Sequence, residues 1–285
     1  MKLKDNPFYN KGGFKIGDKI IDFSTPKIMG VINVTPDSFF DGGKNDSIEK
    51  VVDKANKMVS NGAEFIDIGG YSSRPGASEI SVEEEINRTV PVVQAIYKSI
   101  PGVSISIDTF RKKVAQRNIE VGATWINDIS AGNLDPEMIT WVKENRIPYI
   151  AMHMRGTPKT MQSQSNYNSL SNEVVEELLY SVRDLDSDHP LILDPGFGFS
   201  KTLDQNYELM NNLDLFAQLK HPFLVGVSRK SMIYNLLQSS PEEALNGTTV
   251  LNTVGVLKGA SLLRVHDVKE AFEVLKIIQK LNNGG

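Results

Sequence analysis

The stretch VSISIDTFRKKVAQRNIEVGATWIND, residues 103–128, contains one complete unit of a parallel α/β fold. Residues 103–108 form a short apolar run that ends in Asp108. Residues 110–121 then have the apolar spacing of an amphipathic helix, and a second apolar run over 124–128 ends in an Asn-Asp pair. Strands of a parallel barrel have this pattern when a reacting group lies at their carboxyl ends.

The same unit recurs along the chain, so that strand and helix patterns alternate. We expect eight strands, near residues 27–33, 64–69, 103–108, 124–128, 148–153, 190–194, 222–227 and 261–265. We expect helices near residues 47–61, 82–99, 110–121, 135–146, 170–186, 204–219, 228–259 with a break at Pro241, and 267–282. This alternation predicts an α/β protein with the (β/α)8 architecture of a TIM barrel.

The length and composition are those of a single barrel domain. The chain has 285 residues, of which 40% are hydrophobic, and this is enough for one large core. Residues 12–26 alternate around a Gly-Asp turn, which predicts an N-terminal β-hairpin. We therefore expect residues 1–26 to cap the floor of the barrel and residues 27–285 to form the barrel itself.

Charge and cysteine content limit the expected partners. The formal net charge is −4, whereas a nucleic-acid surface needs a basic excess, so we expect no nucleic-acid partner. The chain has no cysteine, which fits a reducing compartment and makes the cytoplasm the expected location. No window reaches the roughly 18 apolar residues of a spanning helix and the N-terminus lacks a signal-peptide pattern, so no membrane partner is expected.

Three polar residues that follow different strands are expected to meet at one rim of the barrel. They are Asp108, Asn127 and Asp194. Their groups suit the edge of an aminopyrimidinone ring, because carboxylates accept from ring N–H and amino groups while an amide both donates and accepts. Asp108 or Asp194 taken alone could instead cap the helix that follows it. The three together favour a binding site.

The loop after the first strand carries oxygen ligands. Asn33 lies at the expected rim, and Asp37 and Asp41 follow it. Amide and carboxylate oxygens suit a hard cation. The sequence Thr-Pro-Asp-Ser over residues 35–38 is also ordinary turn chemistry, so a plain turn remains an alternative.

Basic residues are concentrated at the same expected rim. Arg74 follows the pair Gly69-Gly70, which lets the backbone approach a ligand closely. SRKS at residues 228–231 follows the seventh strand, and Arg264 and His266 follow the eighth. Barrel phosphate sites commonly use the loops after these two strands, so we predict an anion site there.

Two further features are interpreted as structural. His153, at the end of the fifth strand, is expected to be a hydrogen-bonded structural residue rather than a ligand. Gly196-Phe197-Gly198 lacks the spacing of a dinucleotide phosphate loop. We interpret it as flexible backbone that presents Phe199.

Eight motifs resemble, in order and spacing, those of the dihydropteroate synthase family. They are MGVINVTPDSFFDGG at 29–43, DIGGYSSRPG at 67–76, SIDTF at 106–110, WINDIS at 125–130, AMHMRGTPKTMQ at 151–162, LDPGFGFSK at 193–201, LVGVSRKS at 224–231 and LRVHDV at 263–268. The resemblance implies a transferase of folate biosynthesis and a sulfonamide target. It would join 6-hydroxymethyl-7,8-dihydropterin pyrophosphate to 4-aminobenzoate and release pyrophosphate.

The resemblance also implies roles for individual residues and a homodimeric assembly. The residues implied to bind the pterin are Asp108, Asn127, Met152, Asp194 and Lys230. Those implied to bind pyrophosphate are Asn33, Arg264 and His266, with Asn33 also reaching a Mg²⁺ cofactor. Those implied to surround aminobenzoate are Ser73, Arg74, Pro75, Phe199, Lys230 and Ser231. The implied first-loop residues are Asp37, Phe39 and Asp41, and the implied catalytic residues are Asp108, Asp194, Lys230 and Arg264.

The sequence departs from the family pattern at the second loop, where Tyr71-Ser72-Ser73-Arg74 stands in place of the usual Glu-Ser-Thr-Arg. Ser73 keeps the hydroxyl group but loses a methyl contact.

Three other barrel proteins are alternatives. A methyltetrahydrofolate:corrinoid methyltransferase would share the ring-binding carboxylates but has no use for a pyrophosphate cradle. A catalytically silent pterin-binding protein would keep the carboxylates and lose Arg74, Lys230 or Arg264, all of which are present. A metal-dependent hydrolase would carry a His-x-His motif after the first strand, which this sequence lacks.

Overall fold

Eight parallel strands form a nearly closed barrel in this computed structural model, which describes residues 12–16, 19–34, 44–73 and 78–283. The strands are β3 (Lys27–Asn33), β4 (Phe65–Gly69), β5 (Ser104–Asp108), β6 (Trp125–Asp128), β7 (Tyr149–Met152), β8 (Leu191–Asp194), β9 (Leu224–Val225) and β10 (Leu262–Val265). They lie in the order β8, β7, β6, β5, β4, β3, β10, β9. A single parallel bridge between Leu193 and Phe223 links the two ends of this sheet. The predicted (β/α)8 barrel is confirmed.

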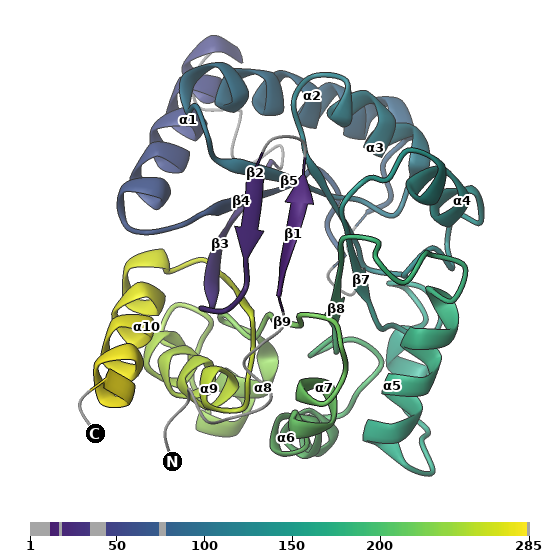
Figure 1. Ribbon diagram of the computed structural model, residues 1–285, viewed down its shortest axis with the longest axis vertical. Helices are drawn as coiled ribbons and strands as arrows, with labels where there is room; N and C mark the ends of the chain where they lie inside the picture. The colour runs from purple at the N-terminus through teal and green to yellow at the C-terminus, as the bar shows by residue number, and fades with distance from the viewer. Residues whose placement is uncertain (1–11, 17–18, 35–43, 74–77, 284–285) are drawn as a thin grey trace.

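The helices surround the strands (Figure 1). They are α1 (Lys44–Ser60), α2 (Val82–Ser99), α3 (Lys112–Ile119), α4 (Glu137–Glu144), the short 3-10 helix η4 (Met161–Ser163), α5 (Leu170–Ser181), α6 (Leu203–Asn211), α7 (Asp214–Ala217), α8 (Ser231–Leu237), α9 (Leu245–Leu257) and α10 (Val268–Asn283). Pro241 lies between α8 and α9, at the predicted break. None of the described helices is both long and apolar enough to cross a membrane.

Two elements differ from the prediction. The expected helix over 204–219 is divided into α6 and α7 at Asn212, the residue that caps the end of α6. Asparagine is a poor residue for a helix interior, because its side chain competes for nearby backbone hydrogen bonds. The expected strand over 222–227 is regular only at Leu224–Val225, because it lies at the seam where the barrel closes through one bridge.

The barrel interior has an apolar lower layer and a polar upper layer, because alternate residues of a strand face the same side. The lower layer consists of Met29, Phe65, Trp125, Ile150, Ile192, Leu224 and Leu262, together with Phe23. Two positions further along five of these strands stand Asp67, Asn127, Met152, Asp194 and Arg264. The intervening residues, such as Ile66 and Ile126, belong to the core between the barrel and its helices. The strands therefore present polar side chains on an apolar floor.

The N-terminal hairpin packs against this floor. It consists of the antiparallel strands β1 (Gly13–Ile16) and β2 (Lys19–Asp22), drawn in purple in Figure 1. The ring of Phe14 lies 5.7 Å from that of Phe23 and 6.2 Å from that of Trp125. The hairpin thus covers the apolar layer from below. The division into a cap of residues 1–26 and a barrel of residues 27–285 stays a prediction.

We expect Phe14→Ala to lower the free energy of unfolding by about 2 kcal/mol, roughly half the cost of emptying a fully buried phenylalanine site, because Phe14 is half-buried. Urea denaturation measures this value. The midpoint should fall while kcat changes little, because the polar layer lies on the other side of the floor. An unchanged midpoint would mean that the hairpin does not unfold together with the barrel.

Candidate active site

A pocket lies at the carboxyl ends of the strands, within the polar layer. Its lining residues are Ser73, Asp108, Asn127, Ile129, Met152, Asp194, Phe199, Gly226, Lys230 and Arg264. All of them except Ile129 and Gly226 belong to the predicted site. The barrel thus brings together side chains that lie far apart in the sequence, because they lie at the ends of seven different strands or in the loops that follow them.

Arg264 forms a cluster with two carboxylates in this pocket. Its Nε donates to Asp67 Oδ2 at 2.7 Å, and its Nη2 donates to Asp108 Oδ2 at 2.7 Å. One guanidinium group therefore donates hydrogen bonds to two carboxylates. Asp67 is fully buried and was not among the predicted site residues, because it lies inside an apolar run rather than at its end. The strand alternation could have revealed it, since Asp67 faces the same side as Phe65 and Gly69.

Burial and the neighbouring charges in this cluster shift the pKa values of Asp108 and Arg264. Burial raises the pKa of Asp108 to about 7; the neighbouring Asp67 adds to the rise, while Arg264 opposes it. Burial lowers the pKa of Arg264, but Asp67 and Asp108 outweigh it and hold that pKa above its ordinary value. Arg264 therefore stays charged, and Asp108 exchanges its proton near neutral pH.

At this site, one buried acceptor atom of Asp67 and one of Asn127 lack a hydrogen-bond partner among the described residues. Asn127 Nδ2 donates to Asp67 Oδ2 at 3.0 Å, so the amide of Asn127 turns its Oδ1 away from this bond. Neither Asn127 Oδ1 nor Asp67 Oδ1 has a partner. Because an unpaired buried acceptor is costly, these atoms indicate a ligand that brings N–H donors.

Asp194 and Lys230 form a second pair of opposite charge on the pocket wall. Burial raises the pKa of Asp194, and the charge of Lys230 opposes this rise. Burial also lowers the pKa of Lys230 to about 8. Lys230 Nζ donates to Phe197 O at 2.5 Å and lies 4.9 Å from the centre of the Phe199 ring. Lys230 and Phe199 therefore form one flat, cationic wall.

Of the residues predicted to form the anion site, only some lie together in the structure. The backbone N–H of His266 donates to Ser228 Oγ at 3.1 Å, and its Nδ1 also lies 3.1 Å from that oxygen. Burial lowers the pKa of His266 to about 4, and Arg264 adds to this, so the imidazole is neutral near pH 7. Arg229 is directed to Asp267, whose Oδ2 accepts from its Nε at 2.8 Å.

The remaining predicted residues lie beside the pocket or outside the described residues. A side chain on Gly69 would begin 3.6 Å from both Asn33 Oδ1 and Asp108 Oδ2, so these two residues lie on either side of Gly69. Ser231 is exposed at the start of α8. The predicted residues that the structure does not describe are Asp37, Phe39, Asp41, Arg74 and Pro75.

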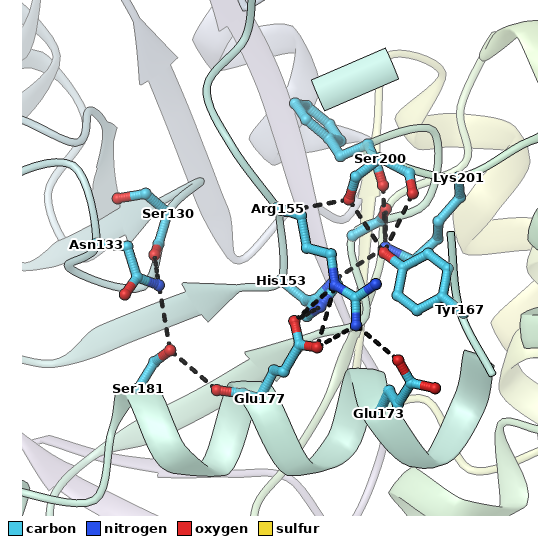
Figure 2. A network of polar contacts seen from close by, with 12 residues as sticks. Ser130, Asn133, His153, Arg155, Tyr167, Glu173, Glu177, Ser181, Ser200 and Lys201 are labelled. Atoms are coloured by element: carbon cyan, nitrogen blue, oxygen red, sulfur yellow. Dashed lines mark hydrogen bonds and ion pairs between the residues drawn. The ribbon is translucent and has the colours of Figure 1, made fainter. Parts of the chain in front are cut away.

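His153 is a hydrogen-bonded structural residue, as predicted. It is buried behind the pocket and contacts Lys201 and Glu177 in the network of Figure 2. Lys201 was not among the predicted residues, although it lies in the motif at 193–201. A lysine that follows a glycine-rich turn gives no sequence signal of burial.

The fold and the pocket define a (β/α)8 barrel protein with a polar pocket at the carboxyl ends of its strands. The family model described as "Pterin binding enzyme" matches residues 29–266. The dihydropteroate synthase of Escherichia coli K12 is 43% identical over 263 residues, which are 91% of this chain and 93% of that protein.

Solved structures agree with the sequence match. The dihydropteroate synthase of Yersinia pestis in a sulfonamide complex has a TM-score of 0.88 at 36% identity, covering 95% of this chain and 99% of that chain. That of Xanthomonas albilineans with 4-aminobenzoic acid has a TM-score of 0.85 at 33% identity, covering 94% and 97%. The chain therefore belongs to the pterin-binding enzymes and, among them, to the dihydropteroate synthases, which are transferases of folate biosynthesis.

Proposed function

We propose that the pocket at the mouth of the barrel binds 6-hydroxymethyl-7,8-dihydropterin pyrophosphate and 4-aminobenzoate and joins them with release of pyrophosphate. The unpaired acceptors Asp67 Oδ1 and Asn127 Oδ1 carry this proposal. Together with Asp108 and Asp194 they offer acceptors to the amino and ring N–H groups of the pterin. Met152 supplies an apolar contact in the same pocket.

The reaction proceeds by dissociative substitution at the pterin methylene group. Aminobenzoate is a weak nucleophile, so the barrier falls most when the leaving pyrophosphate and the cationic pterin are both stabilised. Arg264, with His266 and Asn33 beside it, stabilises the departing anion. Asp108 and Asp194, when ionised, stabilise the positive charge that develops on the ring. No covalent bond to the protein is needed.

Mg²⁺ would fit the rim as an ion held by few protein ligands rather than one enclosed by protein. In the part of the chain that the structure describes, no three His, Asp or Glu residues could surround a metal ion. Asn33 is exposed, and its amide oxygen lies across Gly69 from Asp108. Mg²⁺ commonly takes one or two protein ligands and completes its shell with phosphate and water. Asn33 would hold the ion, which would supply positive charge to the leaving group.

Aminobenzoate is assigned to the wall formed by Phe199 and Lys230. Its ring can lie against the Phe199 ring, and its carboxylate is attracted by the Lys230 ammonium. Ser73, at the pocket lining, and Ser231, at the start of α8, offer hydroxyl groups. Arg74 and Pro75 are assigned to the same wall on the resemblance alone.

The assay that tests this function mixes the protein with the pterin pyrophosphate, aminobenzoate and Mg²⁺. We expect pyrophosphate and dihydropteroate to appear in equal amounts, and sulfonamides to compete with aminobenzoate. Methyl transfer from methyltetrahydrofolate to a corrinoid, with no pyrophosphate release, would instead support the methyltransferase alternative. Binding of pterin without either reaction would indicate a silent binding protein.

We also propose that the chain forms a homodimer through α8 and α9. Leu236 and Leu237 of α8, and Val250 and Leu257 of α9, are each more than half exposed. Such apolar residues on neighbouring helices suit a second copy of the same surface. Light scattering of the purified protein measures the assembly. A monomer at micromolar concentration would contradict the proposal.

The cytoplasmic location stays a prediction.

A further inference from the structure

The loop that joins β8 to α6 positions two of the residues that the proposed function places against the ligands. Phe199 lies on the loop, and the loop's Gly196 N–H donates at 2.8 Å to Oδ1 of Asp194, the last residue of β8. Gly196, Gly198 and Ser200 have left-handed backbone angles, with φ of 72°, 82° and 47°. Because the loop has no helix or strand ladder, its carbonyl groups are satisfied by turn hydrogen bonds, such as that from the Phe199 N–H to Gly196 O at 3.1 Å, and by side chains.

Lys201, at the end of this loop, supplies these partners from inside the protein. Its Nζ donates to Gly196 O, to Phe199 O and to His153 Nδ1, each at 3.0 Å. A protonated lysine has three N–H groups, so all of them are used. The residue is only 4% exposed. On the pocket side, Lys230 binds the intervening carbonyl of Phe197.

His153 and α5 support Lys201 from behind (Figure 2). Since His153 Nδ1 accepts from Lys201, the ring proton lies on Nε2, which donates to Glu177 Oε2 at 3.2 Å. Glu177 also accepts from Arg155 Nε at 3.0 Å. The backbone N–H of Arg155 donates to Ser200 Oγ at 3.1 Å. The network therefore begins and ends on the same loop.

The charges in the network agree with this arrangement of protons. Burial lowers the pKa of His153 to about 4, with the charge of Lys201 adding to the effect, so the ring is neutral near pH 7. The hydrogen bond from His153 lowers the pKa of Glu177 to about 2, which keeps it a carboxylate. Burial lowers the pKa of Lys201 to about 7, so the ammonium form predominates below pH 7.

We propose that Lys201 is a positioning residue for the transferase reaction. Supported by His153 and Glu177, it holds the Gly196 and Phe199 carbonyls so that the Phe199 ring and the Asp194 carboxylate face their ligands. Lys201 itself touches no substrate. The proposal rests on the proposed function, which places Phe199 against aminobenzoate and Asp194 against the pterin.

The first test is Lys201→Met, assayed at pH 6.5. We expect KM for aminobenzoate to rise about tenfold, which corresponds to about 1.4 kcal/mol, while kcat changes much less. The matched control is Lys258→Met, which removes a lysine whose Nζ pairs with Asp214 at 2.8 Å and should leave KM unchanged. An unchanged KM in folded Lys201→Met would overturn the proposal. A wild-type protein that releases no pyrophosphate would contradict the proposed function instead.

A pair of variants at His153 tests the same network with less risk to folding. His153→Gln keeps an acceptor for Lys201 and a donor for Glu177, whereas His153→Leu removes both. We expect KM for aminobenzoate to stay near the wild-type value in His153→Gln and to rise several-fold in His153→Leu. Equal KM values in the two variants would overturn the role of this hydrogen-bonded chain.

A double-mutant cycle separates positioning from general destabilisation. If Lys201 acts through Phe199, then Lys201→Met should raise KM for aminobenzoate less than about twofold in a Phe199→Ala background. His153→Leu should behave in the same way in that background. Effects that multiply fully in the double variants would show that Lys201 does not act through the Phe199 ring, and would overturn the proposal.

Discussion

Arg264→Met is expected to lower kcat/KM for the pterin pyrophosphate by about a thousandfold. Asp67 and Asp108, which accept from the guanidinium at 2.7 Å each, hold it in place, and removing one donor that stabilises charge developing in the transition state costs about 2.7–4 kcal/mol. Loss of about 4 kcal/mol of transition-state stabilisation corresponds to a factor of about a thousand. Steady-state kinetics at saturating aminobenzoate measures the change.

Two roles of Arg264 are distinguished by which ligand loses more binding affinity in this variant. If Arg264 stabilises pyrophosphate, affinity for the pyrophosphate ester should fall far more than affinity for the free pterin alcohol. If it only orients Asp108, both affinities should fall equally, and the assignment to pyrophosphate would be wrong. Arg229→Met is the matched control, because it breaks another arginine-carboxylate pair, with Asp267 at 2.8 Å. It should not change the ratio of the two affinities.

The same variant should also destabilise the fold by about 3–5 kcal/mol, because it leaves the fully buried Asp67 without its cation. Urea denaturation at pH 7 measures this cost. Partial rescue by the double variant Asp67→Asn, Arg264→Met is expected, since the uncompensated charge is then gone. Destabilisation that persists in full in the double variant would show that lost packing, not charge, is responsible.

The positions of the site residues could largely be predicted because of how parallel strands are arranged. Asp108 and Asp194 end apolar runs and Asn127 lies one position before such an end, and strand ends of a barrel meet at one rim. Strand ends do not predict Asp67, because it lies in the middle of its strand. Its inward-facing position, between Phe65 and Gly69, carries the same information.

Contacts between loops could not be predicted, since they depend on tertiary packing. Lys201 is buried only because His153 and two carbonyl groups surround it, and nothing in the order of residues shows this. Arg229 looked equivalent to Lys230 in the sequence, yet Asp267 turns it away from the pocket.

The structure gives Tyr71 a physical role at the second loop, where the sequence departs from the family pattern. Its ring lies edge-on to Phe110 at 5.2 Å, and the Arg111 guanidinium lies 5.2 Å from its centre. Arg111 also pairs with the buried Glu85 at 2.9 Å. The Tyr71 ring therefore contributes a cation–π contact with Arg111.

Asp108→Asn is expected to make the protein more stable at pH 8 while it weakens pterin binding. Burial raises the pKa of Asp108 from 3.8 to about 7, so the folded state keeps a proton that the unfolded state has lost between these values. The free energy of unfolding therefore falls as pH rises through this range. Above pH 7 Asp108 is charged in both the folded and the unfolded protein, and the folded protein bears the full cost of burying the carboxylate.

Asparagine carries no charge and so removes this cost. We expect an increase on the order of 2 kcal/mol in the free energy of unfolding at pH 8, and no increase at pH 4, where aspartic acid is neutral in the folded state. This figure is smaller than the pKa change alone implies, because the side chain is 20% exposed and shares Arg264 with Asp67. Urea denaturation of both proteins at pH 4, 6 and 8 gives the comparison.

Asp108→Asn should bind the pterin more weakly, by about 1.5–3 kcal/mol, because the charged acceptor for the ring N–H groups is lost. Calorimetric titration with the pterin alcohol measures this. Asp184→Asn, which neutralises an exposed aspartate, is the control and should change neither quantity. The difference in the free energy of unfolding between Asp108→Asn and wild type could instead be smaller at pH 8 than at pH 4. That result would show that ionisation of Asp108 costs the folded protein little. Full pterin affinity in the folded variant would remove Asp108 from the site.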